Sequence, residues 1–141
     1  LEVSFREDLV LEPQWQTYPS PFREPFSVLV MRIDEMVAEK IRALYQRGNP
    51  RDLYDLWFIF TTYNDDEKVL AQAIQETFKR RQQDVPTEVP TGLTEEFVQN
   101  PDKQKQWKAF AMRAVEGAPD LAEVIAKLRA VAMDLFAAAR A

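Results

Sequence analysis

One lysine lies where the sequence predicts a buried surface. A helix over residues 33–47 would carry an apolar stripe along one side, and Lys40 falls in the middle of it. The predicted stripe comprises Ile33, Met36, Val37, Ile41 and Leu44, and the predicted polar face comprises Glu35, Glu39, Arg42 and Gln46. An unpaired ammonium in apolar surroundings would cost several kcal/mol, so we expect an anion beside Lys40. A nearby carboxylate could serve as that anion.

Three charged residues that could meet this lysine follow in the next predicted helix. Asp52 and Asp55 are spaced i,i+3, and Arg51 and Asp55 are spaced i,i+4, so all three project near one edge of the first turns. The rest of this helix is apolar nearly all round and should be buried. Its apolar residues are Leu53, Tyr54, Leu56, Trp57, Phe58, Ile59 and Phe60. The charges are therefore expected to gather at a contact between two helices.

A short turn must join these two helices. Gly48 suits the left-handed residue that ends the first helix, Asn49 and Pro50 turn the chain, and the second helix can start at Arg51. This connection would carry Arg47 and Arg51 at its two ends.

Each of these residues also has an ordinary structural interpretation. Carboxylates such as Asp52 and Asp55 are favoured near any helix N-terminus by the helix dipole. Arg51 could form an intrahelical pair with Asp55, and Lys40 could extend its ammonium past the core to solvent. Spacing alone leaves the structural and the functional interpretations open.

Composition narrows the possible chemistry. The chain has 18 basic and 23 acidic side chains, which argues against sequence-blind DNA binding through a broad basic surface and leaves room for a local basic pocket. Sequence-specific DNA is not expected as a partner either. It has no cysteine and no histidine, which excludes thiolate–zinc sites and histidine bases. Three glycines are too few for a phosphate-cradling loop. With no long apolar run, we expect a cytoplasmic domain without a membrane partner.

The elements around the helix pair can be predicted from their patterns. Residues 1–11 alternate like a half-buried strand, and residues 26–31 form an apolar run typical of a covered strand. Residues 12–25 contain four prolines and three aromatic residues, so we expect an extended connection outside the sheet, held in place by its rings. Helices are predicted over residues 67–81, 94–99 with Thr94 as its cap, 101–115, and from Pro119 onward, with a loop over 82–92. Gly117 closes the helix over 101–115, and the last helix carries one broad apolar stripe.

Two clusters of basic residues could contact a phosphate backbone. Lys79, Arg80 and Arg81 more readily indicate a helix C-terminus, where cations complement the dipole. A second cluster gives residues 101–115 a basic face that is either solvated or bound to RNA. It comprises Lys103, Lys105, Lys108 and Arg113.

The stretch Glu39 to Ile59, EKIRALYQRGNPRDLYDLWFI, resembles the nucleotidyltransferase toxins of the AbiEii/AbiGii family from abortive-infection and toxin–antitoxin systems. The resemblance extends back through VSFRE and, more loosely, forward through the helical tail with Trp107. It implies an α+β, mostly α chain: a C-terminal helical bundle with a small N-terminal strand remnant of a polymerase β-like nucleotidyltransferase sheet. The implied division is residues 1–32 for the remnant strands and 33–141 for the helical domain.

The resemblance also implies roles for residues already singled out. Lys40 would hold substrate phosphate, Arg47 and Arg51 would assist in substrate binding, and Asp52 and Asp55 correspond to the family's aspartate motif. Implied partners are a nucleoside triphosphate with Mg²⁺, a tRNA acceptor and a cognate antitoxin protein.

The sequence departs from the family pattern in one respect. The family's Gly-Ser motif and its paired metal-binding carboxylates are absent, and Glu2 is at most a weak candidate for a third carboxylate. The metal ligands are therefore unknown. Two-metal catalysis is not expected from this chain, nor tight binding of Mg²⁺ and nucleotide. The alternative is a non-catalytic helical module that binds a protein such as an antitoxin.

Overall fold

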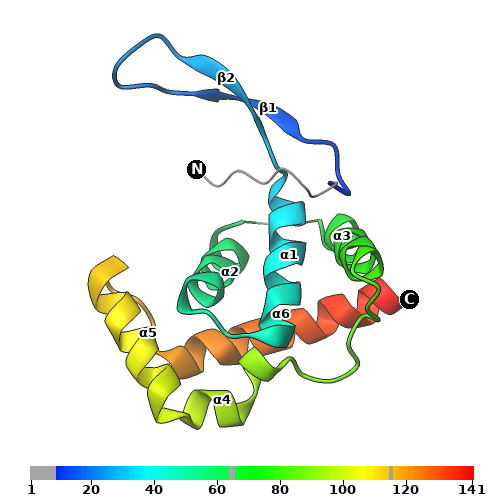
Figure 1. The fold of residues 1–141 in the computed structure, drawn as a ribbon, viewed down its shortest axis with the longest axis vertical. Coiled ribbons are helices and arrows are strands. Elements are labelled where there is room, and N and C mark those ends of the chain that lie inside the picture. Colours follow the sequence, from blue (N-terminus) through cyan, green and yellow to red (C-terminus); the bar gives the residue numbers. More distant parts are fainter. Residues whose placement is uncertain (1–8, 64–65, 115) are drawn as a thin grey trace.

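A computed structural model describes residues 9–63, 66–114 and 116–141. A β-hairpin precedes six helices and one short 3₁₀ helix (Figure 1). The elements are β1 (Gln14–Tyr18), β2 (Phe26–Val30), α1 (Ile33–Gln46), α2 (Pro50–Thr62), α3 (Glu67–Arg80), η1 (Thr91–Leu93), α4 (Glu95–Gln99), α5 (Pro101–Ala114) and α6 (Leu121–Arg140). The predicted α+β, mostly α class is confirmed.

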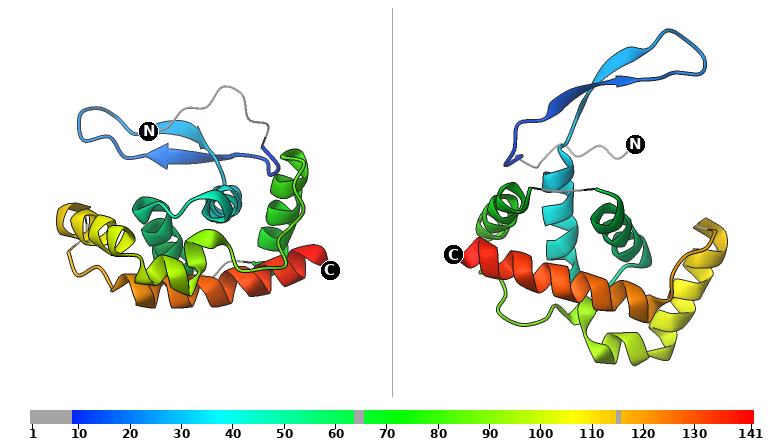
Figure 2. Two further views of the ribbon diagram at one scale, coloured as in Figure 1. Left: turned by 60° about the horizontal axis from the view of Figure 1, so that its bottom comes forward. Right: turned by 180° about the vertical axis from the view of Figure 1, so that it is seen from behind.

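Helix α1 is the centre of the bundle. It lies between α2 and α3, and the long helix α6 crosses behind these three (Figures 1 and 2). Val37, Ile41 and Leu44 of α1 are almost fully buried, as predicted, whereas Met36 is 37% exposed. The apolar stripe predicted for the last helix is also buried, and Phe136 of α6 meets Phe78 of α3 edge to face. The core therefore encloses three sides of α1.

The hairpin corrects one prediction about the N-terminal part. Residues 12–25 were expected to stay outside any sheet, yet Gln14–Tyr18 pairs antiparallel with Phe26–Val30. Pro13 and Pro19 flank this strand and do not interrupt it, so its ladder can form. Its aromatic residues do not anchor the segment on the core either, since Trp15 is 71% exposed.

The other predicted strand lies mostly outside the described part of the chain. Of residues 1–11, only Leu9–Leu11 are described, and they include a bend and no strand. The strand predicted over residues 26–31 is confirmed and ends at Val30. The proposed division at residues 32 and 33 coincides with the passage from hairpin to helix and stays a prediction.

Gly48 has a different role from the one predicted. It does not adopt a positive φ, whereas Gly117 does, at 72°. A side chain on Gly48 would collide with the ring of Phe97 from α4, so glycine is needed here for close packing. Gly92 packs against the same turn, because a Cβ there would lie 3.0 Å from the Leu44 carbonyl oxygen. The turn between α1 and α2 is thereby fixed against η1 and α4.

Candidate functional site

Lys40 meets both aspartates of α2. Its Nζ donates to Asp52 Oδ1 at 2.8 Å and lies 3.0 Å from Asp55 Oδ2. The side chains of Lys40 and Asp52 are 18% and 14% exposed, and that of Asp55 is 38% exposed. The predicted contact between Lys40 and the two aspartates is therefore present. It is partly buried, and Asp55 is its most exposed member.

Local structure explains why these carboxylates reach the lysine. The side chain of Asn49 accepts a hydrogen bond from the Arg51 N–H at 3.0 Å and caps α2, and Pro50 occupies its first turn. The helix therefore begins one residue earlier than predicted. Asp52 and Asp55 then lie one turn apart on the face toward α1, where Lys40 is half-buried.

The electrostatics keep Lys40 charged. Burial, the largest single effect, lowers the pKa of Lys40, but the hydrogen bonds and negative charges of Asp52 and Asp55 together raise this pKa above its ordinary value of 10.5. An ammonium has three N–H donors, and these two carboxylates take two of them. One donor remains for an additional anion such as a phosphate oxygen.

Arg47 and Arg51 lie close in the chain to this cluster but do not join it. Both side chains are exposed, and neither makes an ion pair with a residue in the described part of the chain. The intrahelical pair between Arg51 and Asp55 is not formed, because Asp55 bonds to Lys40. Both arginines remain free to meet an external anion, and their role in substrate binding stays a prediction.

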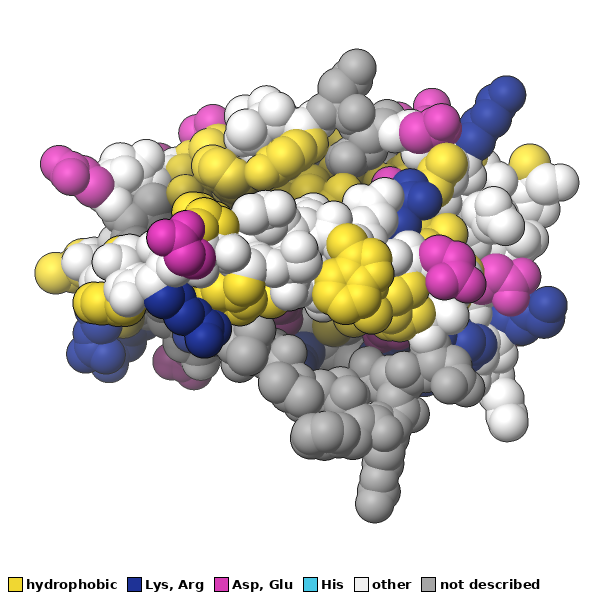
Figure 3. Space-filling model, turned by 90° about the horizontal axis from the view of Figure 1, so that it is seen from above, with side chains coloured by type: hydrophobic (Ala, Val, Ile, Leu, Met, Phe, Trp, Pro, Cys, Tyr) yellow, Lys and Arg dark blue, Asp and Glu magenta, His cyan; other side chains and the backbone are white. Residues whose placement is uncertain are grey.

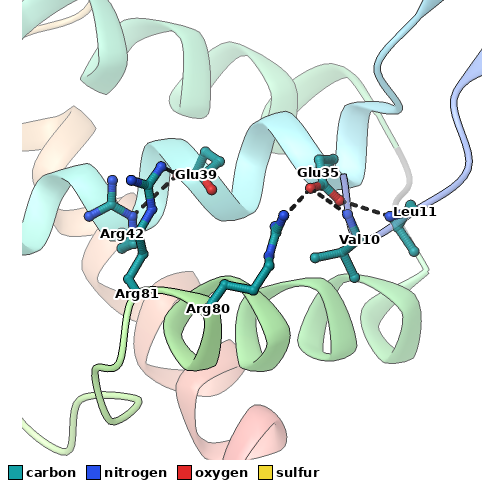
Figure 4. A network of polar contacts seen from close by, with 7 residues as sticks. All are labelled: Val10, Leu11, Glu35, Glu39, Arg42, Arg80 and Arg81. Atoms are coloured by element: carbon teal, nitrogen blue, oxygen red, sulfur yellow. Dashed lines mark hydrogen bonds and ion pairs between the residues drawn. The ribbon is translucent and has the colours of Figure 1, made fainter. Parts of the chain in front are cut away.

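A carboxylate of α1 is more deeply buried than its position in the sequence pattern indicates. Glu35 was assigned to the polar face, and this was wrong, since it is only 1% exposed. Its carboxylate accepts hydrogen bonds from the backbone N–H groups of Val10 at 2.9 Å and Leu11 at 3.1 Å, and from Arg80 at 3.0 Å (Figure 4). No spacing rule connects these residues, because they come from three separate segments.

The three basic residues at the end of α3 form ion pairs with glutamates of the same chain. Arg80 pairs with Glu35, and Arg81 lies 3.7 Å from Glu39, which also accepts from Arg42 at 3.2 Å (Figure 4). Lys79 lies 3.5 Å from Glu76. These contacts agree with a helix end and do not favour a nucleic-acid patch.

The basic residues of α5 differ from those of α3 in their ion pairing. Lys103, Lys105, Lys108 and Arg113 form no ion pair with any residue of the described ranges. Lys103 is half-buried and lies with its Nζ 5.3 Å from the ring centroid of Phe97. This face is therefore available to a polyanion, as the sequence left open.

The cluster around Lys40 does not suit a magnesium ion. The ammonium already occupies the space between Asp52 and Asp55. Residues 9–63, 66–114 and 116–141 contain no group of three acidic side chains that could hold a metal.

None of the helices in these ranges combines the length and apolar character needed to span a bilayer.

Fold and site together define a helical bundle, joined to a small hairpin, that holds a charged lysine between two aspartates of the next helix. The model of the nucleotidyl transferase AbiEii toxin family, of type IV toxin–antitoxin systems, matches residues 1–134. The chain belongs to this family. No curated protein and no solved structure matches it.

Proposed function

We propose that this chain supplies nucleotide-phosphate and tRNA-binding residues to a toxin of the AbiEii nucleotidyltransferase type and does not transfer nucleotides by itself. The observation that carries the proposal is the position of Lys40, 2.8 Å from Asp52 and 3.0 Å from Asp55 at a partly open helix contact. In this proposal Lys40 donates its remaining N–H to a phosphate oxygen, while Asp52 and Asp55 position and orient the ammonium.

The surrounding charges support this role. Lys40 and its two aspartates together carry one net negative charge, which alone would repel a phosphate. Arg47 and Arg51 flank the start of α2 without ion pairs to described residues and would offset that charge through their long-range electrostatic field. Both arginines are thus expected to contribute to nucleotide affinity.

An NMR titration of the ¹⁵N-labelled chain tests the proposal. Because the expected affinity is weak, with Kd on the order of 1 mM, amide shifts are a better measure than heat. ATP with magnesium should shift amides around Lys40 and in the first turns of α2, and adenosine, which lacks phosphate, should not. Equal shifts with both ligands, or none with ATP, would refute phosphate binding at this site.

The hairpin favours a second candidate function, the binding of an antitoxin protein. Trp15 and Leu29 lie opposite each other in the ladder and are 71% and 52% exposed, and Phe22 in the connecting turn is 95% exposed. Seen from above, hydrophobic side chains gather over this part of the molecule (Figure 3). Exposed apolar patches of this kind mark interaction surfaces.

The two candidate functions can be separated by substitutions in the hairpin. Replacing Trp15 and Leu29 by serine should abolish binding of the cognate antitoxin in a pull-down with purified proteins. The same variant should retain the ATP-dependent shifts at Lys40, because the hairpin takes no part in that cluster. Retained antitoxin binding would exclude the hairpin as its docking surface.

A further inference from the structure

Two cations line a hollow at the C-terminal end of α1. The hollow lies between the turn from α1 to α2 and the beginning of α5, and its volume is about 370 Å³. The residues lining it are Arg47, Gly48, Asn49, Pro50, Lys103 and Gln106. Two of them are cations contributed by different segments, and none of the described residues that line the hollow is acidic.

Both cations are available to a ligand. Neither Arg47 nor Lys103 makes an ion pair with any residue that the structure describes. Lys103 is held over the ring of Phe97, with its Nζ 5.3 Å from the centroid. That ring in turn packs against Gly48, which leaves no space for a side chain there. The wall that carries Lys103 is therefore fixed to the turn that carries Arg47.

The N-terminus of α2 contributes little to this hollow. Pro50 has no N–H, and the Arg51 N–H is already bonded to Asn49 Oδ1 at 3.0 Å. Recognition must come from side chains: the two cations and the amide of Gln106, which lies one turn after Lys103 on the same helix. Two cations and a neutral donor around an open hollow are suited to the oxygens of a phosphate.

We propose that this hollow binds a phosphate group between Arg47 and Lys103. It is a separate subsite from the contact at Lys40, because Arg47 follows that lysine by about two helical turns, about 10 Å along the axis of α1. The phosphate belongs either to an RNA backbone or to a free nucleotide. The inference rests on the proposed function only in taking the ligand to be a substrate of this protein.

The test compares charge-removing variants of the 141-residue chain. Binding of a fluorescently labelled single-stranded RNA is measured by anisotropy at about 50 mM salt, where phosphate contacts are strong. Lys103→Gln and Arg47→Gln should each weaken binding about three- to tenfold. Lys68→Gln is the matched control, because Lys68 is an exposed lysine at the start of α3, away from the hollow, and makes no ion pair with a described residue.

A double-mutant cycle shows whether Arg47 and Lys103 bind the same phosphate or only attract RNA independently through their charges. If Arg47 and Lys103 hold one phosphate, the loss in the double variant should differ from the sum of the two single losses. If both variants leave RNA binding unchanged but weaken the ATP-dependent NMR shifts, the hollow takes a nucleotide phosphate, and the proposal still holds. An effect equal to that of Lys68→Gln with both ligands would overturn it.

Failure of phosphate binding in the hollow can be distinguished from failure of phosphate binding at Lys40. The contact at Lys40 is tested by the amide shifts around Lys40 itself, and the hollow is tested by the coupling between Arg47 and Lys103. Arg47→Gln and Lys68→Gln should melt at the wild-type temperature, since neither replaced side chain forms a hydrogen bond or ion pair among the described residues. Lys103→Gln should melt only slightly lower, because it loses the contact with the ring of Phe97.

Discussion

Two of the charges on helix α1, those of Glu35 and Lys40, have different surroundings. Glu35 is 1% exposed and receives three donors, two backbone N–H groups and Arg80, all from the chain itself. Lys40, five residues later, is 18% exposed and lies beside Asp55, which is 38% exposed. One of its N–H donors has no partner among the described residues. The first charge is closed off from solvent, and the second remains open on one side.

The difference indicates which charge serves the fold and which is suited to a ligand. The carboxylate of Glu35 receives all its hydrogen bonds from within the protein and joins three segments of the chain. An external ligand would add no stabilising interaction to it. A lysine that two carboxylates keep charged, with one donor left over, can bind a further anion without first losing a partner. Substitutions can test this division by measuring stability and ligand binding separately.

The largest effect is expected at Glu35. Glu35→Ala removes the acceptor for Val10, Leu11 and Arg80 and should lower the free energy of unfolding by about 3 to 5 kcal/mol. Glu35→Gln keeps an acceptor oxygen and should cost less. Urea denaturation measures both, and a loss under about 1 kcal/mol for the alanine variant would show that the network is not structural.

Gly48→Ala should have the next largest effect. The added methyl group would collide with the ring of Phe97 and push α4 away from the turn between α1 and α2, at a cost of about 1 to 3 kcal/mol. The turn that joins the helices of Lys40 and its two aspartates would lose this support, while none of their charges is replaced. Phe97→Leu in the same chain should recover part of the loss. If the double variant is no more stable than Gly48→Ala alone, the steric explanation is wrong.

Lys40→Met should destabilise the protein less than Glu35→Ala. It leaves Asp52 and Asp55 facing each other without a cation, but the exposure of Asp55, at 38%, limits the cost to about 1 to 2 kcal/mol. Adding Asp52→Asn and Asp55→Asn removes the repulsion and should restore most of the stability in urea denaturation. A loss as large as that of Glu35→Ala would mean that the two charges do not differ as described.

The smallest effect concerns pH. Because the pKa of Lys40 is raised in the folded state, its ion pairs contribute stability below its unfolded pKa, and this contribution is lost as pH rises through the folded pKa, above 10.5. The difference in unfolding free energy between wild type and Lys40→Met should therefore stay constant from about pH 7 to 9 and shrink only in strong alkali. A decline between pH 7 and 9 would contradict this assignment.

The sequence predicts the elements with internal periodicity well. The stripes of α1 and α6, the cap at Thr94 and the left-handed Gly117 follow from local rules, as does the approach of Lys40 to Asp52 and Asp55. Contacts between distant segments could not be predicted in this way. Gly48 is required by a ring 49 residues later, and Glu35 is buried by partners up to 45 residues away. Only the three-dimensional packing brings these groups together.

The most direct test of the central claim is the affinity for ATP with magnesium of the Lys40→Met chain, compared with a Lys68→Met control in the same NMR titration. If Lys40 binds the phosphate, Lys40→Met should bind ATP at least tenfold more weakly, a change of about 1.4 kcal/mol, and the affinity of the control should be unchanged. Equal affinity in the two variants would contradict this prediction and would leave Lys40 as a structural ion-pair partner of α2.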